Sequence, residues 1–299
     1  MDFFNQRMWI GTFAMASSTA WATPHLGMAS QSTKTGLRTA VFQHELATPS
    51  SSACPSDMVE VDGEYCPTVE QICTRYIPGQ EKRDRCAEYR PTARCYGKPE
   101  KKRFCIDRYE YPNVSGIKPV VGVTWEESRD LCSASGKRLC KDKEWTLACE
   151  GHERVPYPYG FKRDKEACNI DREYIMPDND AYGDLKRRSA EIARTDQRDK
   201  SGERASCTSP FGVHDMTGNV DEWVVNEKGK PNEEPYVSGL KGGYWGPVRN
   251  RCRPMTTDHN QWHSGYQIGF RCCGDVDERS SGEQPQARAP VGVASGRAK

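Results

Sequence analysis

The chain has 299 residues, a formal net charge of +1 at pH 7 and a mean hydropathy of −0.84. Its charges are scattered and no apolar run is long enough to span a membrane, so we expect neither a nucleic-acid partner nor a membrane-spanning protein. Its 14 cysteines are an even number without a Cys-x-x-Cys pair, which favours disulfides formed outside the cytosol over metal sites.

The N-terminal segment predicts export. A short apolar run from Met8 to Ala16 is followed by Ala20-Trp21-Ala22, which offers an A-x-A cleavage signal. We therefore predict a signal peptide over 1–22. Residues 23–53 are rich in Ser, Thr, Ala and Pro, which predicts a linker. The mature protein would lie in the periplasm, in the cell envelope or outside the cell.

A cysteine-rich segment comes next. It is polar and has little to bury, so we expect disulfides to hold it in place of a core. The sequence does not choose among the possible pairings of its cysteines. They are Cys54, Cys66, Cys73, Cys86, Cys95 and Cys105.

Two alternating segments flank the middle four of these cysteines. Met58–Val61 and Phe104–Glu110 alternate apolar and polar residues, which predicts two strands. The cysteine-rich segment is therefore interpreted as an insert at about 62–104 within one domain that spans 54–275. The tail over 276–299 has no periodicity, and we expect it to be disordered.

Two helices are predicted after the insert. Residues 124–134 predict a helix that begins at Thr124, because Glu127 stands three residues later and completes a capping box. A second helix is predicted over about 142–149. It ends at Cys149.

The segment 212–223 predicts an ordered loop that binds a cation. Its two glycines, its asparagine and its carboxylates oppose a regular helix or strand interior. Hard oxygen donors recur along it, and such donors are how proteins hold calcium. A solvated acidic loop over a buried Trp is the alternative. The predicted calcium ligands are Asp215, the carbonyl oxygens of Gly218 and Val220, and Glu222.

A series of motifs in fixed order identifies a family. They are Pro119-Val120-Val121-Gly122-Val123-Thr124-Trp125, Gly136-Lys137-Arg138-Leu139, Glu144-Trp145, Tyr157-Pro158-Tyr159-Gly160, Phe211-Gly212, Asp215 to Trp223, Lys241-Gly242-Gly243-Tyr244-Trp245 and Gly269-Phe270-Arg271. Together they resemble the formylglycine-generating enzyme family, the sulfatase-modifying factors. The resemblance covers roughly 58–274. It implies an α+β fold of the C-type-lectin-like kind that is rich in loops and stapled by disulfides.

The resemblance also implies two disulfides and a second calcium site. The family's eukaryotic members would pair Cys132 with Cys272 and Cys149 with Cys252. Each bridge would close a long loop and stabilise the fold by about 4–5 kcal/mol in the chain-entropy model. The second calcium site would use Asn169 and Ile170 with a downstream aspartate, and a solvated loop is the alternative there. The candidate aspartates are Asp178, Asp180 and Asp184.

The family's oxidase chemistry needs two further cysteines, which bind Cu(I) as thiolates. The first would stand four residues after the second glycine of the Lys241 motif, where this chain has Pro247. Counted from Lys241, Cys252 stands where the second copper cysteine would be. Counted back from Cys272, it matches the structural cysteine instead. Under either count only one cysteine remains for the copper pair. Tyr244 replaces the family's serine, and Asp221 replaces its tryptophan. We therefore predict no catalytic residues, and we expect calcium but not copper.

Two further sets of residues were weighed as binding groups. Arg249, Arg251 and Arg253 alternate along the chain and could clamp a carboxylate or sulfate, but we favour ion pairs within the fold. His259 and His263 would ligate a metal on a helix, but this segment favours a solvated loop.

We predict an exported, catalytically silent family member that binds or scaffolds a protein or peptide ligand, which the sequence does not identify. The alternative is an active copper-dependent oxidase that converts a protein cysteine to formylglycine through a rearranged pair, Cys252 with Cys273. A structural cell-envelope protein, in which the insert matters most, is the third hypothesis.

Overall fold

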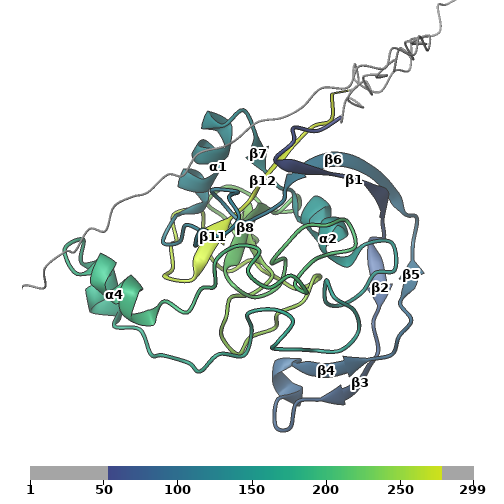
Figure 1. Ribbon diagram of the computed structural model, residues 1–299, viewed down its shortest axis with the longest axis horizontal. Coiled ribbons are helices and arrows are strands. Elements are labelled where there is room, and N and C mark those ends of the chain that lie inside the picture. Colours follow the sequence, from purple (N-terminus) through teal and green to yellow (C-terminus); the bar gives the residue numbers. More distant parts are fainter. Residues whose placement is uncertain (1–52, 278–299) are drawn as a thin grey trace, which may run out of the picture. The chain divides into compact units, whose positions relative to one another are not determined.

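The protein is described by a computed structural model over residues 53–277. The predicted signal peptide lies outside the described residues, as do the predicted linker and tail apart from residues 53, 276 and 277. Short helices and strands are joined by long loops (Figure 1). No helix within 53–277 has both the length and the apolar character needed to cross a membrane.

One four-stranded sheet contains the strands that were predicted on either side of the insert. β1 and β6 pair antiparallel along their whole length, and β12 and β7 continue the sheet in the order β1-β6-β12-β7. Val61, Phe104 and Ile106 alternate toward the core, where they pack with Trp145 and Leu147. The bounds are β1 Met58–Tyr65, β6 Glu100–Asp107, β7 Arg138–Leu139 and β12 Cys272–Gly274.

A second four-stranded sheet has the order β10-β9-β8-β11, with β8 and β11 parallel. Trp223, Leu240 and Phe270 project from it into a core shared with Trp125. The indole Nε1 of Trp125 donates to the carbonyl of Val224 at 2.9 Å, which fixes the helix against this sheet. The bounds are β8 Asp221–Val225, β9 Ser238–Lys241, β10 Met255–Thr256 and β11 Ile268–Phe270.

Both predicted helices are confirmed. The first is α1, Trp125–Ala134, and Thr124 forms the predicted capping box with Glu127. The second is α2, Asp142–Glu150, which packs on β1 and β6. Two shorter helices, α3 Asn179–Gly183 and α4 Arg188–Thr195, follow in the charged segment between α2 and β8.

Seven disulfides use all 14 cysteines of the chain. The adjacent Cys272 and Cys273 of β12 bond in different directions, because successive side chains of a strand point to opposite faces. Cys272 joins Cys132 of α1, and Cys273 joins Cys140 beyond β7. The sheet is thereby fastened from both faces. The remaining pairs of the main domain are Cys149–Cys252 and Cys168–Cys207.

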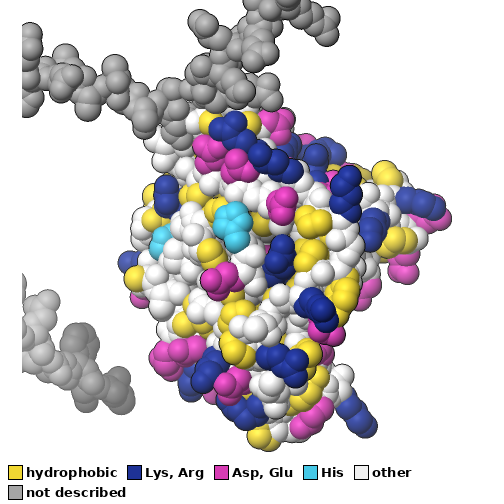
Figure 2. All heavy atoms as spheres, turned by 90° about the vertical axis from the view of Figure 1, so that its right-hand side faces the viewer, with side chains coloured by type: hydrophobic (Ala, Val, Ile, Leu, Met, Phe, Trp, Pro, Cys, Tyr) yellow, Lys and Arg dark blue, Asp and Glu magenta, His cyan; other side chains and the backbone are white. Residues whose placement is uncertain are grey.

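The insert between β1 and β6 consists of two small antiparallel sheets, β2 with β5 and β3 with β4. It runs along one side of the domain (Figure 1). On that face, Figure 2 shows basic side chains interspersed with hydrophobic and acidic ones. Its disulfides are nested, Cys54–Cys105 outside Cys66–Cys95 outside Cys73–Cys86. The elements are β2 Thr68–Glu70, β3 Cys73–Tyr76, the 3₁₀ helix η1 Glu81–Arg83, β4 Cys86–Tyr89 and β5 Arg94–Tyr96.

The tip of the insert packs on the main domain. Tyr157 donates its hydroxyl to the carbonyl of Cys86 at 2.7 Å, and its ring contacts Tyr89 edge-on. Arg251 pairs with Asp84 of the insert and also donates to the Tyr89 hydroxyl. These contacts place the tip of the insert against the loop that follows β9.

Candidate functional site

A cavity of about 430 Å³ lies between the tip of the insert and the loop after β9. The main domain contributes Gly242 and Gly243 at the end of β9, and Pro247 and Val248 farther along the loop. Aliphatic side chains and exposed backbone therefore form much of its wall. The charged lining residues are Arg83, Arg85, Asp221 and Arg249.

The loop is held in shape by a tight turn. Gly242 and Gly243 have φ values of 87° and 70°, which other residues rarely adopt. A Cβ atom at Gly242 would come within 2.9 Å of the carbonyl oxygen of Met216, so the turn also needs the small residue for close approach. The amide of Gly243 donates to Asp221 Oδ1 at 3.0 Å.

Arg163 supports the far side of the loop. Its Nη2 donates to the carbonyl of Val248 at 3.1 Å and to Asn250 Oδ1 at 2.6 Å. Asn250 in turn donates to the carbonyl of Tyr244 at 2.6 Å. The side chain of Arg163 is nearly buried and pairs with Asp171 at 2.7 Å. The cavity wall is therefore anchored to the core by a buried ion pair.

Burial governs the carboxyl group in the cavity. It raises the pKa of Asp221 to about 7, against the hydrogen bond from Gly243 that lowers it. The positive charge of Arg249 also lowers this pKa, but by less than burial raises it. Asp221 therefore carries less than a full negative charge at neutral pH.

The arginines around the cavity differ in how they are neutralised. Arg251 pairs with Asp84, and Arg253 pairs with the buried Glu150 through contacts of 2.5 and 2.6 Å. The ion pairs favoured from the sequence are thus present for these two. Arg249 is exposed and makes no hydrogen bond or ion pair with any residue in the described range.

The insert adds two guanidinium groups that sequence reasoning missed. Arg83 is exposed, and its side chain also makes no hydrogen bond or ion pair to residues 53–277. Arg85 is buried and its Nη2 contacts Asp171 at 2.5 Å, but its Nε has no acceptor. Nothing in the local sequence indicates that these residues face the loop after β9. The approach of the two segments is a tertiary contact.

The positions of the copper cysteines hold no thiol. Pro247 lines the cavity where the first cysteine would stand. Cys252 is bonded to Cys149, and Cys273 is bonded to Cys140. The pair required by the alternative oxidase hypothesis is therefore not free in this structure. A Cu(I) site of two thiolates does not fit the residues present.

The structure brings the predicted ligands of the first calcium site into one buried loop. Asp215 is 4% exposed, and its Oδ2 accepts the amide of Gly202 at 2.7 Å. Burial raises the pKa of Asp215 to about 7. The carbonyl oxygens of Gly218 and Val220 accept no hydrogen bond from the described residues, which leaves them available to a cation.

The fourth predicted ligand, Glu222, is already engaged. Arg271 contacts both its carboxylate oxygens at 2.6 and 2.7 Å, and Trp145 Nε1 donates to it at 2.7 Å. Arg271 is fully buried and belongs to the Gly-Phe-Arg motif, but its pairing with Glu222 was not predicted. Glu222 is therefore first an ion-pair partner, and its contribution to a cation site would be secondary.

A further buried carboxyl lies beside this loop. Glu110 accepts hydrogen bonds from Asn219 at 2.9 and 3.0 Å and from Ser201 at 2.9 Å. Burial raises its pKa, and the charges of Asp215 and Glu222 raise it further. When all three carboxyls are ionised, Arg271 neutralises only one of their charges. This excess of negative charge, with two open carbonyl oxygens, fits a calcium ion.

Two observations limit the metal sites. In the described part of the chain, no three His, Cys, Asp or Glu side chains converge as a metal cluster. At the second predicted calcium site, Arg172 Nε donates to Asn169 Oδ1 at 2.8 Å, so a cation there would have to share that oxygen with the guanidinium. Ile170 packs with the Cys168–Cys207 disulfide.

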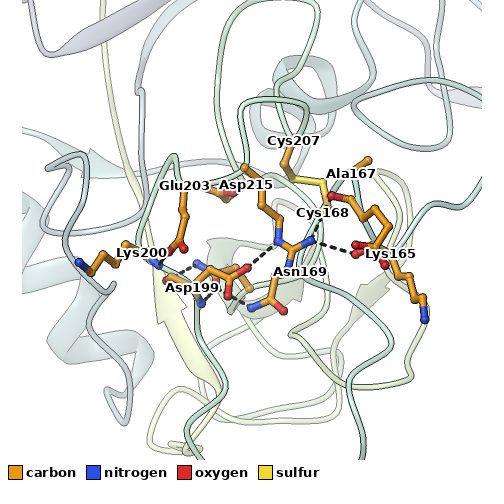
Figure 3. A network of polar contacts seen from close by, with 12 residues as sticks. Lys165, Ala167, Cys168, Asn169, Asp199, Lys200, Glu203, Cys207 and Asp215 are labelled. Atoms are coloured by element: carbon orange, nitrogen blue, oxygen red, sulfur yellow. Dashed lines mark hydrogen bonds and ion pairs between the residues drawn. A yellow bond between two sulfur atoms is a disulfide. The ribbon is translucent and has the colours of Figure 1, made fainter.

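The polar network around Asn169 is held by side chains (Figure 3). Asn169 donates to Asn219 Oδ1 at 3.1 Å and to the carbonyl of Gln197 at 2.9 Å. Arg204 links Asp199, at 2.5 Å, to the carbonyl of Lys165, at 3.0 Å. Two of the three candidate aspartates make other contacts. Asp178 caps α3, and Asp184 accepts from the amide of Lys186.

Comparison with known proteins gives a family and several relatives. Residues 75–276 match the family model of the sulfatase-modifying factor enzyme 1-like domain. The inactive C-alpha-formylglycine-generating enzyme 2 of Bos taurus is 29% identical over 170 residues, which are 53% of this chain and 52% of that relative. The formylglycine-generating enzyme of Bos taurus is 24% identical over 181 residues, 52% of this chain and 44% of that relative. The chain spans about half the length of the curated relatives it matches.

Among solved structures, PvdO from Pseudomonas aeruginosa matches 75% of this chain and 97% of its own, with a TM-score of 0.46 and 18% identity. The family match, the mixture of short helices and strands and the seven disulfides confirm the predicted α+β, loop-rich and disulfide-stapled fold.

Proposed function

Since the chain belongs to the sulfatase-modifying factor enzyme 1-like family, we propose that it is an exported, non-catalytic member that binds a protein or peptide ligand in the cavity beside the loop after β9. One observation carries the proposal. A cavity is present, and Pro247 lines it where the family's first copper cysteine would stand. A ligand can enter this space without meeting the chemistry that would oxidise it.

The state of the cysteines supports the absence of catalysis. Cu(I) chemistry of this kind needs thiolates, and a cysteine in a disulfide has none to offer. The chain resembles both a relative named inactive and a relative named for the activity, so similarity alone does not choose between them. The seven disulfides, which use every cysteine, favour the non-catalytic function.

The same disulfides support export. Disulfides persist in oxidising compartments and are rare in the cytosol, so seven of them favour a mature protein outside it. We propose that the mature protein is one domain over 54–275. The insert then acts as part of that domain, because its tip contributes Arg83 and Arg85 to the cavity.

Calcium at the loop after Gly212 is part of the proposal. Asp215 and the carbonyl oxygens of Gly218 and Val220 supply hard oxygen donors, and the buried negative charge around them favours a divalent cation. Glu222 would contribute only through a lone pair that Arg271 leaves open. When bound, the ion would neutralise buried charge. No chemical step depends on it.

The experiment is incubation of the purified, copper-loaded protein in air with a Cys-x-Pro-x-Arg peptide of the sulfatase type. We expect the peptide to keep its thiol, and we expect thiol titration of the denatured, unreduced protein to find no free cysteine. Conversion of the peptide cysteine to an aldehyde, seen by mass spectrometry, would contradict the proposal and support the copper-dependent oxidase. A formylglycine-generating enzyme from this family serves as the positive control.

A further inference from the structure

We infer that the cavity binds an acidic, extended peptide, and that Arg83 of the insert and Arg249 of the loop bind its carboxylate groups. The inference rests on the proposed function of the cavity and adds the chemical class of its ligand. It also gives the insert a role in recognition, because one of the two arginines comes from the insert.

The cavity carries positive charge that the fold does not neutralise. The side chains of Arg83 and Arg249 line it, and neither makes an ion pair or a hydrogen bond with the described residues. Arg85 adds a third guanidinium. Its Nη2 donates to Asp171, and its buried Nε has no acceptor. A guanidinium binds a carboxylate, sulfate or phosphate through paired hydrogen bonds. Two unpaired ones beside a cavity therefore favour an anionic ligand.

The cavity contains little to oppose an anion. Asp221 is the one carboxyl among its lining residues, and its Oδ1 accepts the amide of Gly243 at 3.0 Å. That carboxyl offsets at most one of the two unpaired guanidinium charges, those of Arg83 and Arg249. Two acids on adjoining segments, Asp84 and Asp171, are already paired with Arg251, Arg85 and Arg163. The net charge that faces a ligand is positive.

The shape indicates an extended ligand. The cavity continues into a neighbouring groove that shares Arg249 and Pro254 with it and is also lined by Val69 and Gln71 of the insert. Met255 of β10 lines this groove as well. β10 is a two-residue strand at one edge of its sheet, so some of its backbone groups have no partner strand. An extended peptide can pair with such an edge while its side chains enter adjacent pockets.

The lining favours a peptide over an anionic polysaccharide. Leu240, Val248 and Pro254 place aliphatic groups between the guanidinium groups, and the lining residues of cavity and groove include no aromatic ring. An extended peptide alternates side chains with a period of two, so acidic and aliphatic groups can alternate along it. That alternation matches the mixed lining.

The test measures binding of a fluorescent, amide-capped hexapeptide of alternating Glu and Val to the full, oxidised protein by anisotropy. Its control peptide has Gln in place of Glu. We expect the Glu peptide to bind and to weaken with added salt, because exposed charges are screened. Arg83→Gln with Arg249→Gln should weaken binding by about tenfold or more, the effect of losing charge-assisted hydrogen bonds.

Matched variants separate charge from shape and from fold. Arg90→Gln removes another exposed, unpaired arginine of the insert that does not line the cavity, so binding should stay within about twofold. Arg249→Lys keeps the charge and should retain part of the affinity. Val248→Trp fills the cavity and should abolish binding of any ligand that enters it.

Several results would overturn the inference. Equal binding of the Glu and Gln peptides would exclude an acidic ligand. If Val248→Trp then blocked both peptides, the proposed function of the cavity would still stand. The inference of an acidic ligand would also be rejected if the Arg83→Gln, Arg249→Gln double variant bound the Glu peptide as the wild type does. It would be rejected too if the wild type did not bind that peptide. Binding of chondroitin sulfate without binding of the Glu peptide would replace the peptide with a polysaccharide.

Discussion

Two loops meet where the amide of Gly218 donates to the carbonyl of Gly242 at 3.3 Å, and they use their polar groups in opposite ways. The first loop, 212–222, buries its carboxylates and pairs or hydrogen-bonds most of them. The second loop, 242–252, leaves Arg249 exposed and unpaired within the described chain, beside an open cavity. The charge of the first loop therefore stabilises the fold, whereas part of the charge of the second loop remains available to a ligand.

The largest effect should come from removing the cation that pairs with Glu222 of the first loop. Arg271→Met would leave Glu222 buried without its partner, beside Asp215 and Glu110. Breaking a buried ion pair on one side costs about 3–5 kcal/mol, so the free energy of unfolding should fall by that amount. Denaturant unfolding measures it.

The control for this change is Arg187→Met. Arg187 pairs with Asp184 across an exposed turn, where each side chain is about half exposed, so its loss should cost below about 1 kcal/mol. If both variants lost the same small amount, the first loop would not hold the fold as argued.

Calcium should add the next largest effect. The wild type should melt at a higher temperature in calcium than in chelator, because a ligand at a hundred times its dissociation constant stabilises by about 2.7 kcal/mol. Asp215→Asn should remove this gain. It is a cleaner variant than Glu222→Gln, which would also disturb Arg271. An unchanged melting temperature in the wild type on adding chelator would reject calcium.

The sequence predicted the local features of this molecule and missed the contacts between distant segments. Thr124 and Glu127 lie three residues apart, so their capping box could be read directly. Glu222 and Arg271 lie 49 residues apart, so Glu222 was assigned to a metal although it pairs with a guanidinium. The disulfides of the main domain that were named came from the family resemblance, not from spacing.

The cavity shows the same limit. Pro247, Tyr244 and Asp221 marked the lost copper chemistry in the sequence, because each departs from a family motif. Arg83 could not be connected with Arg249, since the insert follows no family motif and its disulfide pairing stayed open. The charge of the cavity therefore emerged only from the tertiary structure.

Protonation of Asp221 should test the boundary between the two loops. It is measured as the difference between wild type and variant, because Asp215 has a similar pKa. Burial raises the pKa of Asp221 to about 7, well above its value in the unfolded chain. The folded state then holds a proton that the unfolded state releases, so this group's contribution to stability falls as pH rises from about 4 to about 7. In chelator, Asp221→Asn should flatten that slope by at most about 1.4 kcal/mol per pH unit.

The measurement is urea unfolding at several pH values in buffers of equal ionic strength. The acids with strongly lowered pKa values, Glu191 and Asp196, change protonation far below this range and do not contribute. A slope that Asp221→Asn leaves intact would mean that this carboxyl is ionised in the folded protein. Asp221 would then carry a full negative charge, and the cavity would be less positive than the comparison of the two loops requires.

The smallest expected effect separates two arginines within the second loop. Arg251→Gln removes the contacts with Asp84 and Tyr89, so the tip of the insert should exchange its amide hydrogens faster and stability should fall by about 1 kcal/mol or less. Arg249→Gln removes no hydrogen bond or ion pair within residues 53–277 and should change neither. Arg251 makes an ion pair within the fold, and Arg249 makes none with residues 53–277. If Arg249→Gln loosened the insert as much as Arg251→Gln, its charge would serve the fold, and the second loop would resemble the first.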